Sequence, residues 1–201
     1  FELNGVRWVV DPGNQDYYPL NKIGFPLSDY SQASERWTLL TKSNLTHSTI
    51  TANGARFKVT ASAPIVDFRR GENSGATIDL TEVFNGQLKS LQRRFTVEGE
   101  KSIVIEDRFE TNALTQEITW QLMTLAEVTP TKTGALLRQS GKELILSILS
   151  PADLRVTVTP LDPPPLKIDK TIAGLKRVEI KLSASLVKES KGRFLVRLSG
   201  H

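Results

Sequence analysis

Residues 91–109 read LQRRFTVEGEKSIVIEDRF, and this stretch decides the fold. Apolar side chains recur at every second position on both sides of the turn Glu98-Gly99-Glu100, although Arg93 interrupts the series. The alternating positions are Leu91, Phe95, Val97, Ile103, Ile105 and Phe109. A period of two is typical of a β-strand with one buried face. The stretch therefore predicts two adjacent strands joined by a short turn.

The same alternation extends along the chain in both directions. On the C-terminal side it recurs at residues 118–122, 144–148, 154–158, 178–186 and 194–198. On the N-terminal side, Asn4-Gly5 and Asn53-Gly54 are hairpin turn signals, with strands predicted at 1–10, 45–52 and 55–63. Strands also fit 65–70 and 75–80. About a dozen short strands with turn residues between them predict an all-β, multi-stranded antiparallel β-sandwich of two or more stacked sheets.

We interpret residues 1–201 as a single β-sandwich domain, because no internal linker divides them. Alternation, rather than solid apolar runs, predicts that each sheet keeps one face in water. One short helix is expected near residues 29–40, where Ser28 or Asp29 can cap it and Ala33, Trp37 and Leu40 follow at helical spacing. Residues 14–27 are predicted to be a loop.

Composition excludes several classes of protein. The chain has no Cys, so it has neither disulfides nor thiolate ligands, and it has no run of about 18 apolar residues that would span a membrane. The net charge of +4 is spread along the sequence, which argues against nucleic acid as a partner. Its sign is consistent with attraction to an acidic polysaccharide. Because residues 1–10 already read as the body of a hairpin, we expect this chain to be a segment of a longer polypeptide.

Few residues are candidates for chemistry. The sequence has no nucleophile elbow, phosphate-binding loop, HExxH or dinucleotide fingerprint, and only two His. Asp11 and His47, each at the edge of a strand or turn, suit Zn²⁺ if a further ligand joins them. The alternative is structural: Asp11 as a turn residue, and His47 as a half-buried residue bonded to a neighbour. Tyr17 or Tyr18 could donate or accept a proton, or pack a loop onto the sheet.

Several motifs together resemble one family. The first is Gly5-x-x-Trp8-x-x-Asp11-x-Gly13 followed by Tyr17 and Tyr18, and the second is Arg36-Trp37, Ser43, then His47-Ser48-Thr49 before Asn53-Gly54. They resemble the C-terminal β-domain of heparinase II/III-like polysaccharide lyases. Ser48 departs from the family pattern, which usually has Asn after the motif His.

The resemblance implies an upstream (α/α) toroid domain that packs against the sandwich, with the substrate cleft between them. It implies cleavage of uronic-acid glycans, glycosaminoglycan- or alginate-like, by β-elimination, with the catalytic groups upstream and no complete catalytic set in this chain. His47, Tyr17, Tyr18 and Arg36 are then expected on the cleft side. Asp11 and His47 would hold zinc in the full-length parent together with a missing upstream His, and no cofactor is expected for the segment alone.

Two hypotheses follow from this reading. In the first, the chain is the sandwich domain of such a lyase, inactive alone, periplasmic or secreted in a bacterium, and able to form a homodimer through an exposed edge. In the second, it is a non-catalytic carbohydrate-binding or structural β-sandwich module. The absorbance of unsaturated product from the full-length protein distinguishes the two.

Overall fold

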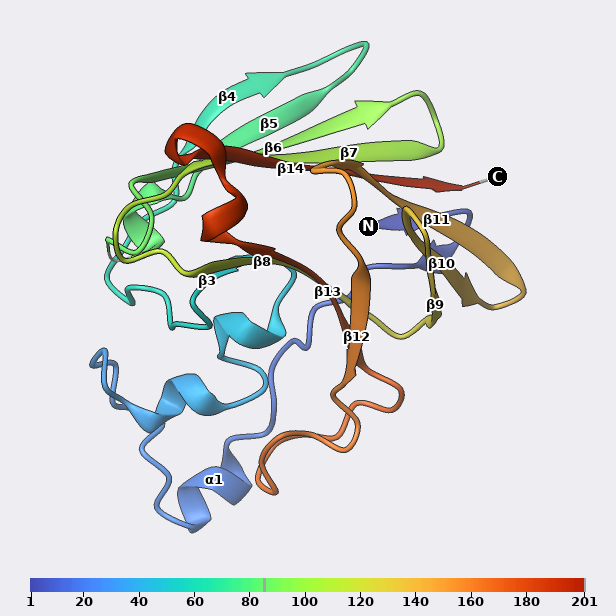
Figure 1. The fold of residues 1–201 in the computed structure, drawn as a ribbon. Coiled ribbons are helices and arrows are strands. Elements are labelled where there is room, and N and C mark those ends of the chain that lie inside the picture. The colour runs from blue at the N-terminus through green and yellow to red at the C-terminus, as the bar shows by residue number, and fades with distance from the viewer. Residues whose placement is uncertain (85, 201) are drawn as a thin grey trace.

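A computed structural model describes residues 1–84 and 86–200 and shows a mostly β structure with two large antiparallel sheets packed face to face (Figure 1). The larger sheet has eight strands in the order β4-β5-β6-β7-β14-β11-β10-β9. These strands are β4 (Ile65–Arg69), β5 (Gly75–Asp79), β6 (Ser90–Glu98), β7 (Ser102–Glu110), β14 (Lys191–Gly200), β11 (Lys142–Ser150), β10 (Gly134–Gln139) and β9 (Glu127–Thr131). The antiparallel sandwich predicted from the sequence is confirmed.

The smaller sheet has the order β12-β13-β8-β3, and a separate ribbon opens the chain. The four strands are β12 (Val156–Pro160), β13 (Lys176–Ser183), β8 (Glu117–Thr124) and β3 (Ile50–Ala52). The ribbon pairs β1 (Glu2–Leu3) with β2 (Val6–Arg7) around Asn4-Gly5, as predicted. The hairpin around Glu98-Gly99-Glu100 also forms, because Leu91 pairs with Phe109 and Phe95 with Ile105 across β6 and β7.

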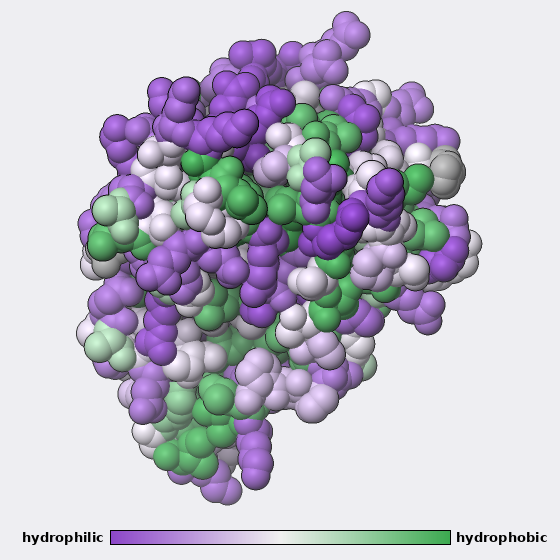
Figure 2. Space-filling model, viewed as in Figure 1, coloured by the Kyte–Doolittle hydropathy of each residue, from purple (hydrophilic) through white to green (hydrophobic). Residues whose placement is uncertain are grey.

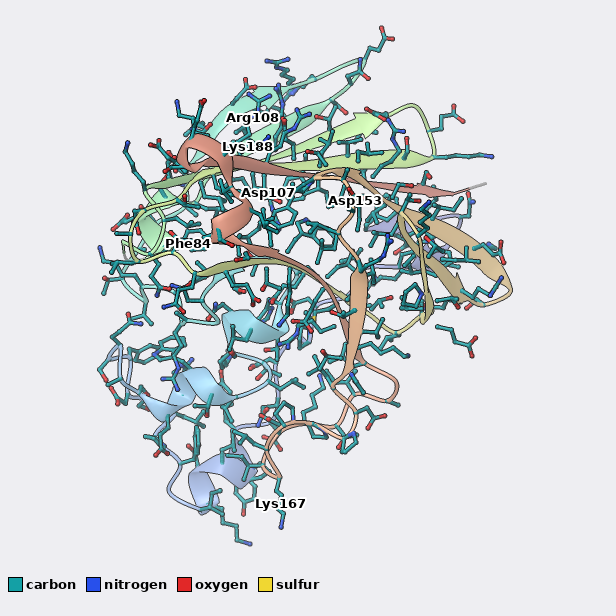
Figure 3. All side chains as sticks on the ribbon, viewed as in Figure 1. Phe84, Asp107, Arg108, Asp153, Lys167 and Lys188 are labelled. Carbon is teal, nitrogen blue, oxygen red and sulfur yellow. The ribbon has the colours of Figure 1, made fainter. Side chains whose placement is uncertain are left out.

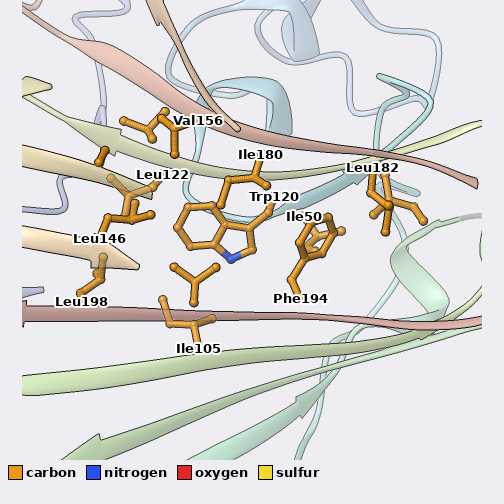
Figure 4. Packing of buried hydrophobic residues seen from close by; sticks show 14 of the residues in the cluster. Ile50, Ile105, Trp120, Leu122, Leu146, Val156, Ile180, Leu182, Phe194 and Leu198 are labelled. Carbon is orange, nitrogen blue, oxygen red and sulfur yellow. The ribbon is translucent and has the colours of Figure 1, made fainter. Parts of the chain in front are cut away.

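The core lies between the two large sheets. Trp120 on β8 is 1% exposed and packs among Ile105 and Phe194 of the opposite sheet (Figure 4). Trp8 is also 1% exposed and belongs to the same cluster. These two indole rings are therefore packing residues and are not available to stack on a sugar.

The outer face of β8 is buried as well, contrary to the expectation that each sheet keeps a wet face. Thr119, Gln121 and Met123 point away from the main core, yet they are 6%, 2% and 0% exposed. A second cluster covers this face, in which Met123 packs with Leu40, Leu161 and Leu175. The N-terminal segment thus lies across the back of the small sheet, and it carries the candidate site.

The helical segments differ from the prediction. The structure has an α-helix, α1 (Tyr18–Lys22), in the stretch predicted to be a loop, where Pro19 stands in the first turn. Within 29–40 only a 3₁₀ turn forms, η1 (Glu35–Thr38), capped by Ser34 rather than Ser28 or Asp29. The reason is packing: Leu39 is extended, so that Leu39 and Leu40 enter two different clusters. The other 3₁₀ turns are η2 (Asn44–Thr46), η3 (Thr81–Phe84), η4 (Ala184–Leu186) and η5 (Lys188–Ser190).

The predicted return strand at 55–63 does not form. Asn53 and Gly54 do adopt the positive φ values of a two-residue turn, 56° and 61°. After the turn, however, the amide side chain of Asn44 donates to the Ala55 carbonyl and accepts from the Phe57 N–H. These bonds hold the chain away from β3, whose ladder partner is β8.

Two strands, β9 and β10, were not predicted. In the part of the chain that the structure describes, no helix has the length and apolarity needed to cross a membrane.

Candidate functional site

The two residues singled out from the sequence meet in the structure. Nδ1 of His47 lies 2.7 Å from Oδ2 of Asp11, although the residues are 36 positions apart. The Asp11 side chain is 68% exposed and the His47 side chain 29%. When the imidazole is in the tautomer that carries its proton on Nδ1, the carboxylate accepts that proton and Nε2 carries the lone pair. Nε2 can then accept a proton, bond a sugar hydroxyl or bind a metal ion.

Asp11 is held by the loop that follows β2. Its Oδ1 accepts from the N–H of Gly13, whose φ of 69° suits glycine. The ammonium of Lys170 donates to the carbonyls of Pro12 and Asn14 at 3.3 and 3.0 Å. Asp11 is therefore a turn residue and a histidine partner at once, so the two readings of the sequence do not exclude each other.

His47 is positioned from β8. The buried Gln121 amide donates to the carbonyl of Asn44 at 2.7 Å and to that of His47 at 2.6 Å. Ser48 Oγ accepts from the N–H of Met123, and the Ser48 carbonyl accepts from Arg93 at 3.4 Å. Ser48, which departs from the family pattern, is thus hydrogen-bonded to β8, the same strand that positions His47 through Gln121.

A cavity of about 310 Å³ opens beside His47. Its lining residues are Trp37, Lys42, Asn44, His47, Thr49, Arg56, Phe57 and Val59. Lys42 and Arg56 are cationic, and none of these lining residues is acidic. A half-buried indole beside two cations suits an acidic sugar, because the ring packs on pyranose C–H groups while the cations attract a carboxylate or sulfate.

Lys42 also connects the cavity to Tyr17. The Lys42 ammonium lies 5.4 Å from the centre of the Tyr17 ring and donates to Oδ1 of Asn14 at 2.9 Å. Hydrogen bonding from Lys42 lowers the pKa of the Tyr17 hydroxyl below its ordinary value. Tyr18 is 71% exposed on α1. Tyr17 is therefore the tyrosine that contacts the lining of this cavity.

Arg36 is 8% exposed. Its guanidinium donates to the Leu27 carbonyl and lies 4.5 Å from the centre of the Tyr30 ring and 5.5 Å from that of Trp37. These contacts fasten the 27–37 segment under the cavity-lining indole. A direct contact of Arg36 with substrate remains a prediction.

The donor set for a metal is incomplete. Two ligands of one tetrahedral zinc lie roughly 3.3 Å apart, given bonds of about 2.0 Å. The 2.7 Å between Asp11 Oδ2 and His47 Nδ1 is instead a hydrogen bond, which leaves Nε2 as the nitrogen of the His47 ring that can bind a metal ion. Within residues 1–84 and 86–200 no group of three His, Asp or Glu residues could hold a metal ion. These residues therefore fit zinc only as part of a shell completed from elsewhere.

Lys42, Arg56 and Phe57 line the cavity beside His47 but were not expected from the sequence. Lys42 follows the Leu39–Leu40 pair, and Arg56 lies where a regular strand was expected. No motif marks them, and Arg56 and Phe57 meet His47 only because the segment after β3 leaves the sheet. Their signal in the sequence is weak: basic residues on both sides of a His.

Comparison with known proteins agrees with this architecture. Among solved structures, the heparan sulfate lyase HepC of Pedobacter heparinus superposes with a TM-score of 0.67 at 14% identity, over 98% of this chain and 29% of that one. A heparinase III structure superposes with a TM-score of 0.60 at 12% identity, over 80% of this chain and 24% of that one. The chain thus spans under a third of the length of these proteins, and at such identities the likeness concerns the fold.

No curated protein sequence matches the chain. The family described as "Heparinase II/III-like, C-terminal" matches residues 1–172, most of the sequence. The resemblance seen in the two N-terminal motifs is therefore confirmed, and the chain belongs to the heparinase II/III-like C-terminal family.

Proposed function

We propose that this chain is the sandwich domain of a polysaccharide lyase, and that it forms one wall of a cleft for uronic-acid-containing glycans cleaved by β-elimination. One observation carries the proposal: His47, fixed by Asp11, lines a cavity with two cations and no acid among its lining residues. An upstream (α/α) toroid domain would supply the other wall and the catalytic base.

In this arrangement Lys42 and Arg56 would bind the carboxylate or sulfate of one sugar residue. Trp37 would support the ring, and His47 Nε2 would face a sugar hydroxyl or a metal ion. Tyr17, whose pKa Lys42 lowers, stands beside this wall. The reaction needs a strong base at the carbon next to the carboxylate, so the chain alone should be inactive.

The experiment is the rise in absorbance of unsaturated product when the full-length protein meets heparan sulfate, alginate and other uronates. Lys42→Ala and Arg56→Ala should each raise KM several-fold and change kcat less, because they remove uniform binding. Lys22→Ala, an exposed lysine on α1, is the matched control. Absence of product with every uronate, together with retained glycan binding, would support the binding-module reading instead.

We further propose zinc as a cofactor of the full-length parent. His47 would bind it through Nε2, with Asp11 holding the ring from behind, an arrangement that strengthens histidine ligands. Zinc there would mainly hold the cleft-side loops. We expect less than one equivalent of zinc on the isolated 201-residue chain by elemental analysis after dialysis. One tightly held equivalent would contradict this.

We also propose a homodimer through β4, an edge strand with Ile65 and Phe68 64% and 63% exposed. Light scattering during gel filtration should give twice the chain mass, and Phe68→Lys should halve it. A monomer at all concentrations would rule this out. By analogy with secreted polysaccharide lyases we expect a bacterial, periplasmic or secreted protein, which cell fractionation tests.

A further inference from the structure

A second cavity is remote from His47. It encloses about 950 Å³ between two segments that leave the sheets: Ser150–Leu154, which links β11 to β12, and Leu186–Lys188, which links β13 to β14. Figure 1 shows that each segment runs between the large sheet and the small sheet, away from the N-terminal loops that carry the first site. The cavity lies beside the end of β11. The last residue of β11, Ser150, pairs with Leu195 of β14, so residues 191–194 of β14 extend past β11 and pair with β7 alone.

The floor of this cavity is apolar and its rim is basic. Phe109, Leu154, Leu182, Leu186 and Val187 contribute hydrocarbon surface, and Leu186 is 67% exposed. Figure 2 shows apolar surface on this face framed by hydrophilic side chains. The basic lining residues are Arg108, Lys188, Lys191 and Arg193, against the acids Asp79 and Glu110.

The acids near the cavity already have partners. Glu110 is paired with Lys89 at 2.6 Å, and that hydrogen bond holds the pKa of Glu110 below its ordinary value. Glu106 is shared between Arg108 at 3.0 Å and Arg193 at 3.7 Å, so one carboxylate meets two guanidinium groups. The rim therefore keeps an excess of positive charge. Arg108 and Lys188 lie near each other at this end of the molecule, whereas Lys167 lies at the opposite end (Figure 3).

We propose that this cavity is a second binding site for an anionic oligosaccharide, an accessory site separate from the cleft at His47. Charge complementarity argues for an anionic ligand, because four basic residues line the cavity against two acids, one of which, Glu110, is paired with Lys89. The apolar floor argues for pyranose rings, whose C–H faces pack on aliphatic surface, over a small inorganic anion. The volume has room for several sugar residues.

The proposal rests on the proposed function for its ligand class. A polymer that runs through the cleft can reach both sites at once, and the second contact then becomes intramolecular. Such a site would raise the affinity for long chains more than for short ones. It would have no effect on the chemical step.

The test uses a sulfated hexasaccharide without uronic acid, which β-elimination cannot cleave, and its desulfated form, with the full-length protein in calorimetric titration at low and high salt. Wild type should bind two hexasaccharides per chain. Lys188→Glu/Lys191→Glu should abolish one binding event or weaken it by roughly tenfold or more, because two charge-assisted contacts become repulsive. Leu186→Ala should weaken the same event without changing its salt dependence.

The control is Lys22→Glu/Lys167→Glu, which makes the same change in charge on surfaces away from the cavity. Lys170 is left unchanged because it holds the Asp11 loop. Unchanged binding in the Lys188/Lys191 variant would overturn the proposal. The proposal would also be overturned if the wild type self-associates and the Lys188/Lys191 variant breaks that self-association while hexasaccharide binding persists. His47→Ala/Lys42→Ala tests the cleft separately. If this variant loses the binding event that Lys188→Glu/Lys191→Glu leaves intact, the cleft binds the glycan whether or not the accessory site does. If it loses neither event, the proposed function fails and the accessory site still stands.

Discussion

Arg93 and Asp107 face each other across β6 and β7 and form a bidentate ion pair inside the sandwich. Nε and Nη2 of Arg93 lie 2.7 and 3.0 Å from the two carboxylate oxygens of Asp107. The side chains are 7% and 0% exposed. Burial raises the pKa of the Asp107 carboxyl, and the guanidinium opposes that rise. Because Arg93 also donates to the Ser48 carbonyl, the pair connects the core to the segment that carries His47.

Breaking this pair from one side should be costly. Asp107→Asn leaves a guanidinium buried without its counter-charge, and we expect a loss of about 3–5 kcal/mol in the free energy of unfolding. Arg93→Met/Asp107→Leu should recover much of that loss, because both charges are gone. Urea denaturation of the two variants measures the difference. A double variant as unstable as Asp107→Asn would contradict this account.

Gln121 should control the position of His47 independently of the ion pair. Gln121→Leu removes both amide bonds to the carbonyls of Asn44 and His47, with an expected cost of about 1–3 kcal/mol in unfolding free energy. The His47 ring resonances should broaden or shift in NMR spectra. Thr119→Val, on the same face of β8, is the control and should leave them in place. Unchanged His47 resonances in Gln121→Leu would show that other contacts hold the segment.

Glu82 should make stability depend on acid. Hydrogen bonds from the Ser62 backbone and from Lys58 and Ser62 side chains lower its pKa to about 2. A carboxyl with a lowered pKa stabilises the fold above its unfolded value of 4.5, and this stabilisation is lost as the pH falls towards 2. The difference in midpoint urea concentration between wild type and Glu82→Gln should therefore shrink over that window. Glu72→Gln, in an exposed turn, is the control; a difference that stays constant from pH 5 to 2 would exclude this role.

Lys42 should set the titration of Tyr17. Since hydrogen bonding from Lys42 is the largest cause of the lowered pKa, Lys42→Met should raise it towards the ordinary value of 10.0. The ultraviolet absorbance of phenolate follows this, and subtraction of a Tyr17→Phe titration assigns the signal. Lys22→Met should not change the curve. The same curve in Lys42→Met as in wild type would remove Lys42 as the cause.

The strands of this fold follow from alternation in the sequence, and the exceptions have physical reasons. Arg93 breaks the apolar series in β6, yet it lies on the inner face, because its partner Asp107 interrupts β7 at the paired position. The 55–63 strand was expected from its pattern, but the Asn44 side chain competes for its backbone groups. Pairs of this kind depend on three-dimensional neighbours and cannot be read from local periodicity.

The candidate site was foreseen in part. Asp11 and His47 were identified from a turn signal and a strand edge, and the structure brings them within hydrogen-bond distance. Lys42 and Arg56 were not, because Lys42 approaches His47 through the irregular path around η2 and Arg56 through the segment after β3 that leaves the sheet. Helix α1 was not predicted, although an Asp before the first turn and a Pro within it are ordinary signs of a helix start. Asp16 Oδ1 accepts from the Tyr18 N–H, and Pro19 stands in the first turn.

The burial of β8 on both faces has a consequence for anyone who would redesign this protein. The segment bearing His47 covers the outer face of the small sheet. Its conformation therefore depends on the hydrogen bonds that Gln121 and Met123 of β8 donate to it. A graft of residues 39–48 onto another scaffold would lose that template. The portable unit is the loop together with its strand.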